Sequence, residues 1–242
     1  ISLPEVASMP SPQVTATVEP IIAPSRSSRA VWVAIAVLEI CVGAAAVLLD
    51  VVVPTFVILV LMTVSLLIRH DHLQSLGVHR LPDAWRSAAQ ILALTVAWTV
   101  LQLALVMPLL EHATGTQQDL TDFADLQGNA AMLGILLLVS WTIAAVGEEL
   151  AYRGYLFTRI TDIAGSTRFG VVLAVVVTSA LFGLAHTEQG VIGVAVTFLD
   201  AIFFCLLRLH YRTLWASVLA HGFNNTIGLT AFFLVGPIYG LW

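Results

Sequence analysis

The sequence predicts an all-α protein, a polytopic bundle of about seven to eight transmembrane helices. Its 242 residues are 59% hydrophobic and only 10% charged, whereas about a quarter of the residues in an ordinary soluble domain are charged. The mean hydropathy is +0.94. The apolar residues gather in runs close to the roughly 20 residues that a helix needs to cross a bilayer. We therefore expect an integral, multi-pass membrane protein whose surroundings are the lipid bilayer.

The charged residues exclude nucleic acid as a partner. All ten basic residues are arginine and the formal net charge is -5, so the chain cannot build the basic surface that nucleic-acid binding requires. The two cysteines, Cys41 and Cys205, lie within apolar runs and lack the spacing of metal ligands. Both are expected to be small buried hydrophobic residues.

Residues 1–29 are expected to form a disordered N-terminal tail, because five prolines among Ser, Thr and Val disfavour a helix. Residues 30–242 are expected to form one integral membrane domain. Within this domain, breaks that contain Pro, Gly, Asp or Arg separate seven apolar runs. The predicted spans are Ala30–Leu49, Val51–Ile68, about Ala88–Leu110, about Ala130–Phe157, Phe169–Ala185, Val191–Leu209 and Leu214–Leu234.

The positions of the arginines predict the orientation, because short cytoplasmic loops are enriched in basic residues. With the tail inside, nine of the ten arginines precede the first span or lie in the loops after the second, fourth and sixth spans. The N-terminus is therefore expected in the cytoplasm and the C-terminus outside, in the plasma membrane. The polar segment 69–86 is expected to be a solvated inner loop, and the acidic stretch 111–129 lies on the outer side.

Seven ionisable residues lie within the predicted spans, where such residues are rare and are functional candidates by default. They are Glu39, Glu148, Glu149, Arg153, His186, Asp200 and His221. Glu39 and Asp200 stand alone in their spans and are expected to make structural hydrogen bonds or to line a cavity wall. The other five belong to three short motifs.

The first motif is Glu148-Glu149-x-x-x-Arg153 in the fourth span. An unpaired charge in a span costs at least about 2.5 kcal/mol, so Arg153 needs a partner. Glu149 precedes Arg153 by one α-helical turn and can share its face, whereas Glu148 points about 100° away. We expect Glu149 to pair with Arg153 and Glu148 to remain free for chemistry.

The other two motifs are Phe182-x-x-x-His186 at the end of the fifth span and His221-x-x-x-Asn225 in the seventh. Counted from the inner side by helical rise, His186 and Glu148 lie about 25–27 Å deep, but His221 lies only about 13 Å deep. The motifs can converge only if helices are tilted or broken around a wet cavity. The expected break positions are Gly183, Gly190, Gly193 and Gly222.

The three motifs supply what peptide hydrolysis needs: a base, a group that holds the water, and donors for the oxyanion. Glu148 is the candidate base because desolvation disfavours its charged form. His186 can hold the water, and His221 and Asn225 can donate to the oxyanion. A zinc ion held by Glu148, His186 and His221 would also satisfy an open three-ligand site. Neither a Gly-x-Ser-x-Gly elbow nor a His-Glu-x-x-His helix occurs.

Taken together and in this order, the three motifs resemble those of the CPBP family, which comprises CAAX proteases and bacteriocin-processing enzymes, also called Abi membrane proteins. The resemblance covers roughly residues 130–230. It implies an intramembrane glutamic endopeptidase that acts without a bound metal or other cofactor. Carried over residue by residue, it makes Glu148 the general base, His186 its partner in holding water, and His221 with Asn225 the oxyanion donors. Glu149 and Arg153 would support the site.

The expected function is hydrolysis of a peptide bond in a membrane-associated protein or peptide substrate, with zinc not favoured. The alternative is a non-catalytic membrane protein, such as a bacteriocin-immunity factor or a scaffold subunit with a partner in a membrane complex. A transporter ranks third, because the sequence lacks the internal repeat that many transporters show.

Overall fold

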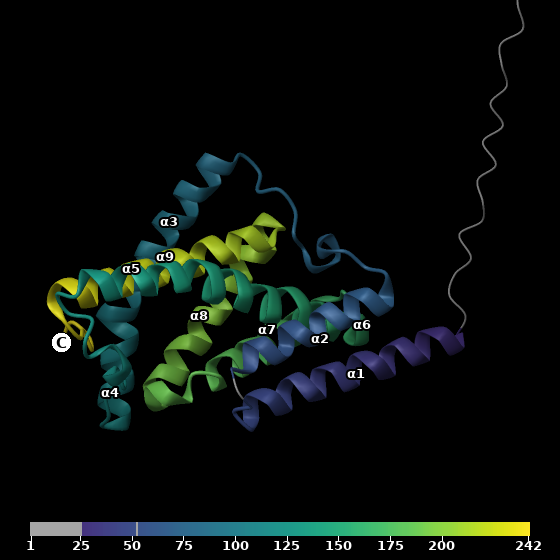
Figure 1. Ribbon diagram of the computed structural model, residues 1–242, viewed down its shortest axis with the longest axis horizontal. Coiled ribbons are helices and arrows are strands. Elements are labelled where there is room, and N and C mark those ends of the chain that lie inside the picture. The colour runs from purple at the N-terminus through teal and green to yellow at the C-terminus, as the bar shows by residue number, and fades with distance from the viewer. Residues whose placement is uncertain (1–25, 52) are drawn as a thin grey trace, which may run out of the picture.

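The computed structural model describes residues 26–51 and 53–242, and all regular structure in these ranges is helical (Figure 1). The predicted helical bundle is therefore confirmed. Most of the predicted tail, 1–29, lies outside the described residues, and its last four residues belong to the first helix. The helices are α1 (Arg26–Leu48), α2 (Pro54–Arg69), α3 (Ala84–Leu101), α4 (Met107–Thr114), α5 (Ala130–Val139), α6 (Phe157–Ala164), α7 (Arg168–Leu184), α8 (Gly190–Tyr211) and α9 (Leu214–Val235).

Two π-helical segments, in which hydrogen bonds join residues five apart, connect some of these helices without a break. Segment η2 (Gln102–Val106) joins α3 to α4, and η4 (Ser140–Leu156) joins α5 to α6. The continuous helices span Ala84–Thr114 and Ala130–Ala164. Each of the seven predicted apolar runs therefore corresponds to one helical unit.

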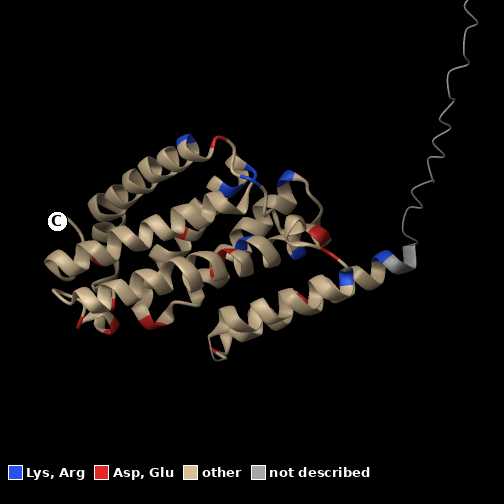
Figure 2. Ribbon diagram, turned by 45° about the horizontal axis from the view of Figure 1, so that its top comes forward, with Lys and Arg blue, Asp and Glu red and all other residues tan. Residues whose placement is uncertain are grey.

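Five of these units are long and apolar enough to cross a membrane. The two shorter apolar helices, α2 and α7, have 16 and 17 residues. The arginines gather toward one side of the bundle, and the acidic residues between α4 and α5 lie away from them (Figure 2). This segregation in space matches the pattern from which the sequence predicts the orientation.

Helix α1 is attached to the bundle through an ion pair cluster around Glu39. Its carboxylate lies 3.3 Å from Arg69 of α2 and 3.5 Å from Arg159 of α6. The Arg159 side chain is only 2% exposed and also pairs with Asp162. Glu39 thus has a structural role, as expected, because two arginines compensate its charge in a low-dielectric region.

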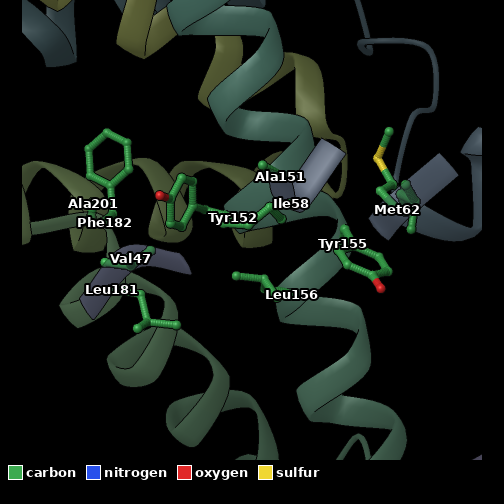
Figure 3. Close-up of a cluster of buried hydrophobic side chains, with 11 residues drawn as sticks. Val47, Ile58, Met62, Ala151, Tyr152, Tyr155, Leu156, Leu181, Phe182 and Ala201 are labelled. Atoms are coloured by element: carbon green, nitrogen blue, oxygen red, sulfur yellow. The ribbon is translucent and has the colours of Figure 1, made fainter. Parts of the chain in front are cut away.

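The largest apolar core cluster packs η4 against α2, α7 and α8 (Figure 3). Tyr152 and Phe182 meet edge to face with ring centroids 5.2 Å apart, a favourable geometry for aromatic pairs. Ile58 of α2 and Leu156 of η4 are fully buried beside them. This packing fixes the rotation of η4, which carries the first motif.

The segment between α2 and α3 is not the fully solvated loop that the sequence predicts. Its short 3₁₀ helix, η1 (Leu73–Leu76), buries Leu76 completely. The backbone carbonyl of Gly77 accepts from the Leu214 amide at 2.8 Å, and that of His79 accepts from the Thr213 hydroxyl at 2.7 Å. The loop folds inward because these carbonyls satisfy the start of α9, where helices leave free amide groups.

This inward loop covers the start of α9. Thr213 and Leu214 are 1% and 2% exposed, so α9 begins inside the protein and not at its surface. His221, two turns farther along, is also buried, with 4% of its surface exposed. Helix α9 begins at Leu214, where the sequence places the start of the last span, so the convergence does not depend on a later helix start.

We expect Thr213→Val to lower the free energy of unfolding by about 1–2 kcal/mol, because the change removes the N-cap and the bond to His79. The matched control is Thr63→Val on the exposed face of α2, where the hydroxyl bonds only to its own helix. Equilibrium unfolding in mixed micelles measures both. Equal effects of the two changes would contradict the role assigned to the inward loop.

Candidate active site

The first motif lies in the π-helical segment η4, and this placement changes the direction of Glu148. Hydrogen bonds over five residues widen the turn, so consecutive side chains rotate by less than the 100° of an α-helix. A carboxylate oxygen of Glu149 lies 3.0 Å from Nδ1 of His221, and one of Glu148 lies 3.7 Å from Nε2 of the same ring. The two glutamates thus face the two nitrogens of one imidazole.

Arg153 pairs with Glu149, as the sequence predicts. Its guanidinium lies 3.1 Å from Glu149, and both side chains are completely buried. The guanidinium also lies over the rings of Phe182, at 4.2 Å, and Phe204, at 5.5 Å. Aromatic faces attract a cation most strongly where water is excluded, so the two rings from α7 and α8 complete the environment of the charge.

His221 is held in one orientation by three neighbours. The Nδ1–H group donates to Glu149, since a carboxylate can only accept, and this leaves Nε2 toward Glu148. Phe204 stacks on the imidazole at 5.1 Å, and Phe182 meets it edge-on at 5.8 Å. The sequence does not reveal Phe204, because nothing in a run of apolar residues on α8 distinguishes the one that faces the site.

His186 follows the end of α7, and its ring is fixed by its own motif. Its Nδ1 lies 2.8 Å from the carbonyl oxygen of Phe182. A carbonyl accepts only, so Nδ1 carries the hydrogen and Nε2 stays available to a water or substrate. Phe182 packs against both histidines, with its centroid 4.8 Å from the ring of His186. This phenylalanine is the common neighbour of the second and third motifs.

One cavity brings together the four residues to which the sequence analysis assigns direct chemistry. It has a volume of about 450 Å³, and its lining includes Glu148, His186, His221 and Asn225. The side chain of Glu148 is 18% exposed, so it is accessible. Glu149 and Arg153 are sealed behind it. The predicted convergence is therefore present in the structure, with four residues at the cavity and two in support.

A close approach of η4 and α9 makes this convergence possible. A Cβ atom added to Gly222 would lie 2.4 Å from the ring of Trp141, so any larger residue would separate the two segments next to His221. Gly222 and Gly193 lie within continuous helices and do not break them, contrary to expectation. The chain changes direction near His186 and Gly190, where η5 (Thr187–Gln189) separates α7 from α8.

The residues that could hold a zinc ion do not surround one position. Among residues 26–51 and 53–242, no group of three His, Cys, Asp or Glu side chains is arranged to hold a metal ion. His186 uses Nδ1 for the carbonyl of Phe182, and His221 uses Nδ1 for Glu149. Both rings leave Nε2 free, but the structure does not group the donors of Glu148, His186 and His221 around one position.

Comparison with known proteins adds one finding. Residues 130–227, less than half of the chain, match the family described as type II CAAX prenyl endopeptidase Rce1-like. The matched range runs from the start of α5 into α9 and contains all three motifs. No curated protein and no solved structure matches the chain. The resemblance to CAAX proteases that the motifs indicate is thus confirmed over this range.

We expect Arg153→Met to lower the free energy of unfolding by about 3–5 kcal/mol, because it leaves Glu149 buried without its arginine partner. Adding Glu149→Gln should recover part of this loss, since the second change removes the uncompensated charge and keeps an acceptor for His221. Unfolding in mixed micelles compares the single and double variants. A double variant that is less stable than Arg153→Met would contradict this account of the pair.

Proposed function

We propose, from the match of residues 130–227 to the type II CAAX prenyl endopeptidase Rce1-like family, that this protein is an intramembrane endopeptidase. It hydrolyses a peptide bond in a membrane-associated protein or peptide. The observation that carries the proposal is the shared cavity of Glu148, His186, His221 and Asn225. A base, two imidazoles and an amide on one concave wall are the groups that acyl transfer to water requires.

In the proposed mechanism, Glu148 is the general base. It takes a proton from a water molecule whose other hydrogen is accepted by Nε2 of His186. The water oxygen attacks the carbonyl carbon, and the electrons of the C=O bond move to the oxygen. Glu148 then passes its proton to the leaving nitrogen as the C–N bond breaks. One water is consumed, one carboxylic acid and one amine form, and Glu148 returns to its starting state.

The developing oxyanion is stabilised from the side of α9. The imidazolium form of His221 donates its Nε2–H group in a hydrogen bond to the oxyanion, and the Asn225 amide donates a second hydrogen bond. Glu149 accepts from Nδ1 of His221 and stabilises the imidazolium, and Arg153 keeps Glu149 charged. A preorganised donor of this kind contributes about 10²–10³ in kcat.

The proposal includes a place and an orientation. The protein lies in the plasma membrane with its N-terminus in the cytoplasm, because the side that collects the arginines would then face the cytoplasm (Figure 2). The acidic segment 111–129 lies on the opposite side. The mechanism uses no metal, and its steps are supplied by side chains alone.

Glu148→Gln should lower kcat by at least about 10²–10⁴, the range that a general base supplies, while insertion and unfolding remain as in the wild type. The measurement compares the protein termini of membranes from cells with the wild type and the variant, followed by assay of any peptide found. The matched control is Glu188→Gln, an exposed glutamate in the turn after His186.

Wild-type processing by Glu148→Gln would overturn the glutamate mechanism. A cellular phenotype that survives both Glu148→Gln and His186→Ala would favour the alternative of a non-catalytic immunity factor or scaffold.

We expect activity to survive metal removal. Dialysis of the purified protein against a strong zinc chelator should leave kcat/KM within about twofold, because the donors of Glu148, His186 and His221 do not share one metal position. Metal content is measured on the same samples. Loss of activity that zinc restores would refute the metal-free mechanism.

A further inference from the structure

Asp200 differs from the other carboxylates of the spans in how its charge is compensated. Glu39 lies within 4 Å of two arginines, Glu149 of Arg153, and Glu148 of His221. No basic side chain among residues 29–51 and 53–242 lies within that distance of Asp200. A carboxylate within a span that lacks a cation is costly, so the environment of Asp200 needs a specific explanation.

The partners of Asp200 are neutral donors from three other segments. Its Oδ1 accepts from the Trp98 indole at 2.6 Å and from the Gln102 amide at 3.0 Å. Its Oδ2 accepts from the Asn224 amide at 3.3 Å. Asn224 is itself fixed, because its oxygen accepts from Thr99. Three neutral donors from α3, η2 and α9 favour the ionised form of this carboxylate on α8, because an ionised carboxylate only accepts.

This charge lies at the wall of the candidate active site. Asp200, Gln102 and Asn224 line the same cavity as Glu148. A carboxylate offers about four acceptor positions and the three donors use three of them, which leaves one for a further donor. The side chain is buried from bulk solvent, with the residue 6% exposed. A cation that enters the cavity would therefore meet a fixed, desolvated negative charge.

We propose that Asp200 recognises a basic side chain, Lys or Arg, of the substrate peptide near the bond that is cut. This inference rests on the proposed endopeptidase function and names its substrate class: an apolar, membrane-associated segment that carries one basic residue. Most of the remaining cavity wall is apolar, with Leu103, Val139 and Phe232 among its residues. The ammonium or guanidinium group would supply the compensating charge that the protein itself does not place beside Asp200.

The test uses the full-length protein in nanodiscs and a series of fluorescence-quenched apolar peptides with both ends blocked. One position at a time near the cleaved bond carries Lys or its uncharged analogue norleucine. We expect the wild type to prefer Lys at one position by roughly 30-fold in kcat/KM, the range for a desolvated charge pair. Asp200→Asn should reduce this ratio to within about threefold, and Asp200→Glu should restore most of it.

Glu39→Gln is the matched control, because it removes another intramembrane carboxylate that does not line the cavity. It should keep the preference for Lys. A wild type without any preference for Lys overturns the proposal whatever the variants do. A preference for Lys that persists in Asp200→Asn also overturns it. An equal fall of kcat/KM for the Lys and norleucine peptides in Asp200→Asn overturns it too, because Asp200 would then only hold the cavity wall in place.

A binding measurement separates this inference from the proposed function. Glu148→Gln is mixed with fluorescent Lys and norleucine peptides, and the dissociation constants are compared with those of Glu148→Gln/Asp200→Asn. We expect tighter binding of the Lys peptide only when Asp200 is present. If the wild type hydrolyses no peptide but this difference is found, the catalytic proposal fails and the recognition site stands. If the wild type hydrolyses the peptides but the dissociation constants do not differ, the recognition site fails and the catalytic proposal stands.

Discussion

The buried ion pair of Glu149 and Arg153 is the interaction on which the rest of the site depends. Two opposite charges with no exposed surface are stable only if their surroundings supply further compensation. Phe182 of α7 and Phe204 of α8 cover the guanidinium, and His221 of α9 donates to the carboxylate. Compensation of this one ion pair therefore requires contacts from three helices that pack around η4. These contacts also place the imidazole of His221 beside Glu148.

The pair of Glu149 and Arg153 lies between the closely packed interior and the cavity. On its sealed side, Arg153 and Glu149 have no access to solvent, and on the other side Glu148 borders the cavity. Adjacent glutamates thus have opposite environments, although one imidazole touches both. Sharing one imidazole links them, because Nδ1 of His221 bonds to Glu149 and its Nε2 faces Glu148. The support of the site and its chemistry are joined through this ring.

Charge compensation also distinguishes the two ends of the molecule. On the arginine side, Glu39 and Arg159 belong to a network in which each charge has an opposite neighbour, and this network attaches α1 and α2 to α6. In the cavity, Asp200 has only neutral donors. The first arrangement is complete without a ligand and is structural. The second leaves a charge that a substrate can compensate, which is why we assign recognition to it.

The sequence by itself determined the helical class, the seven apolar units and the six candidate site residues, because hydropathy, helical spacing and the cost of intramembrane charge are local properties. It also paired Glu149 with Arg153, which one helical turn separates. It did not determine Phe204, the donors around Asp200 or the inward loop that caps α9, since these contacts join residues far apart in the chain. The π-helical turns of η4 and the packing of α9 against them decided how Glu148 and His221 face each other. Only packing of whole helices against one another selects such features, because their free energy comes from contacts that no single segment contains.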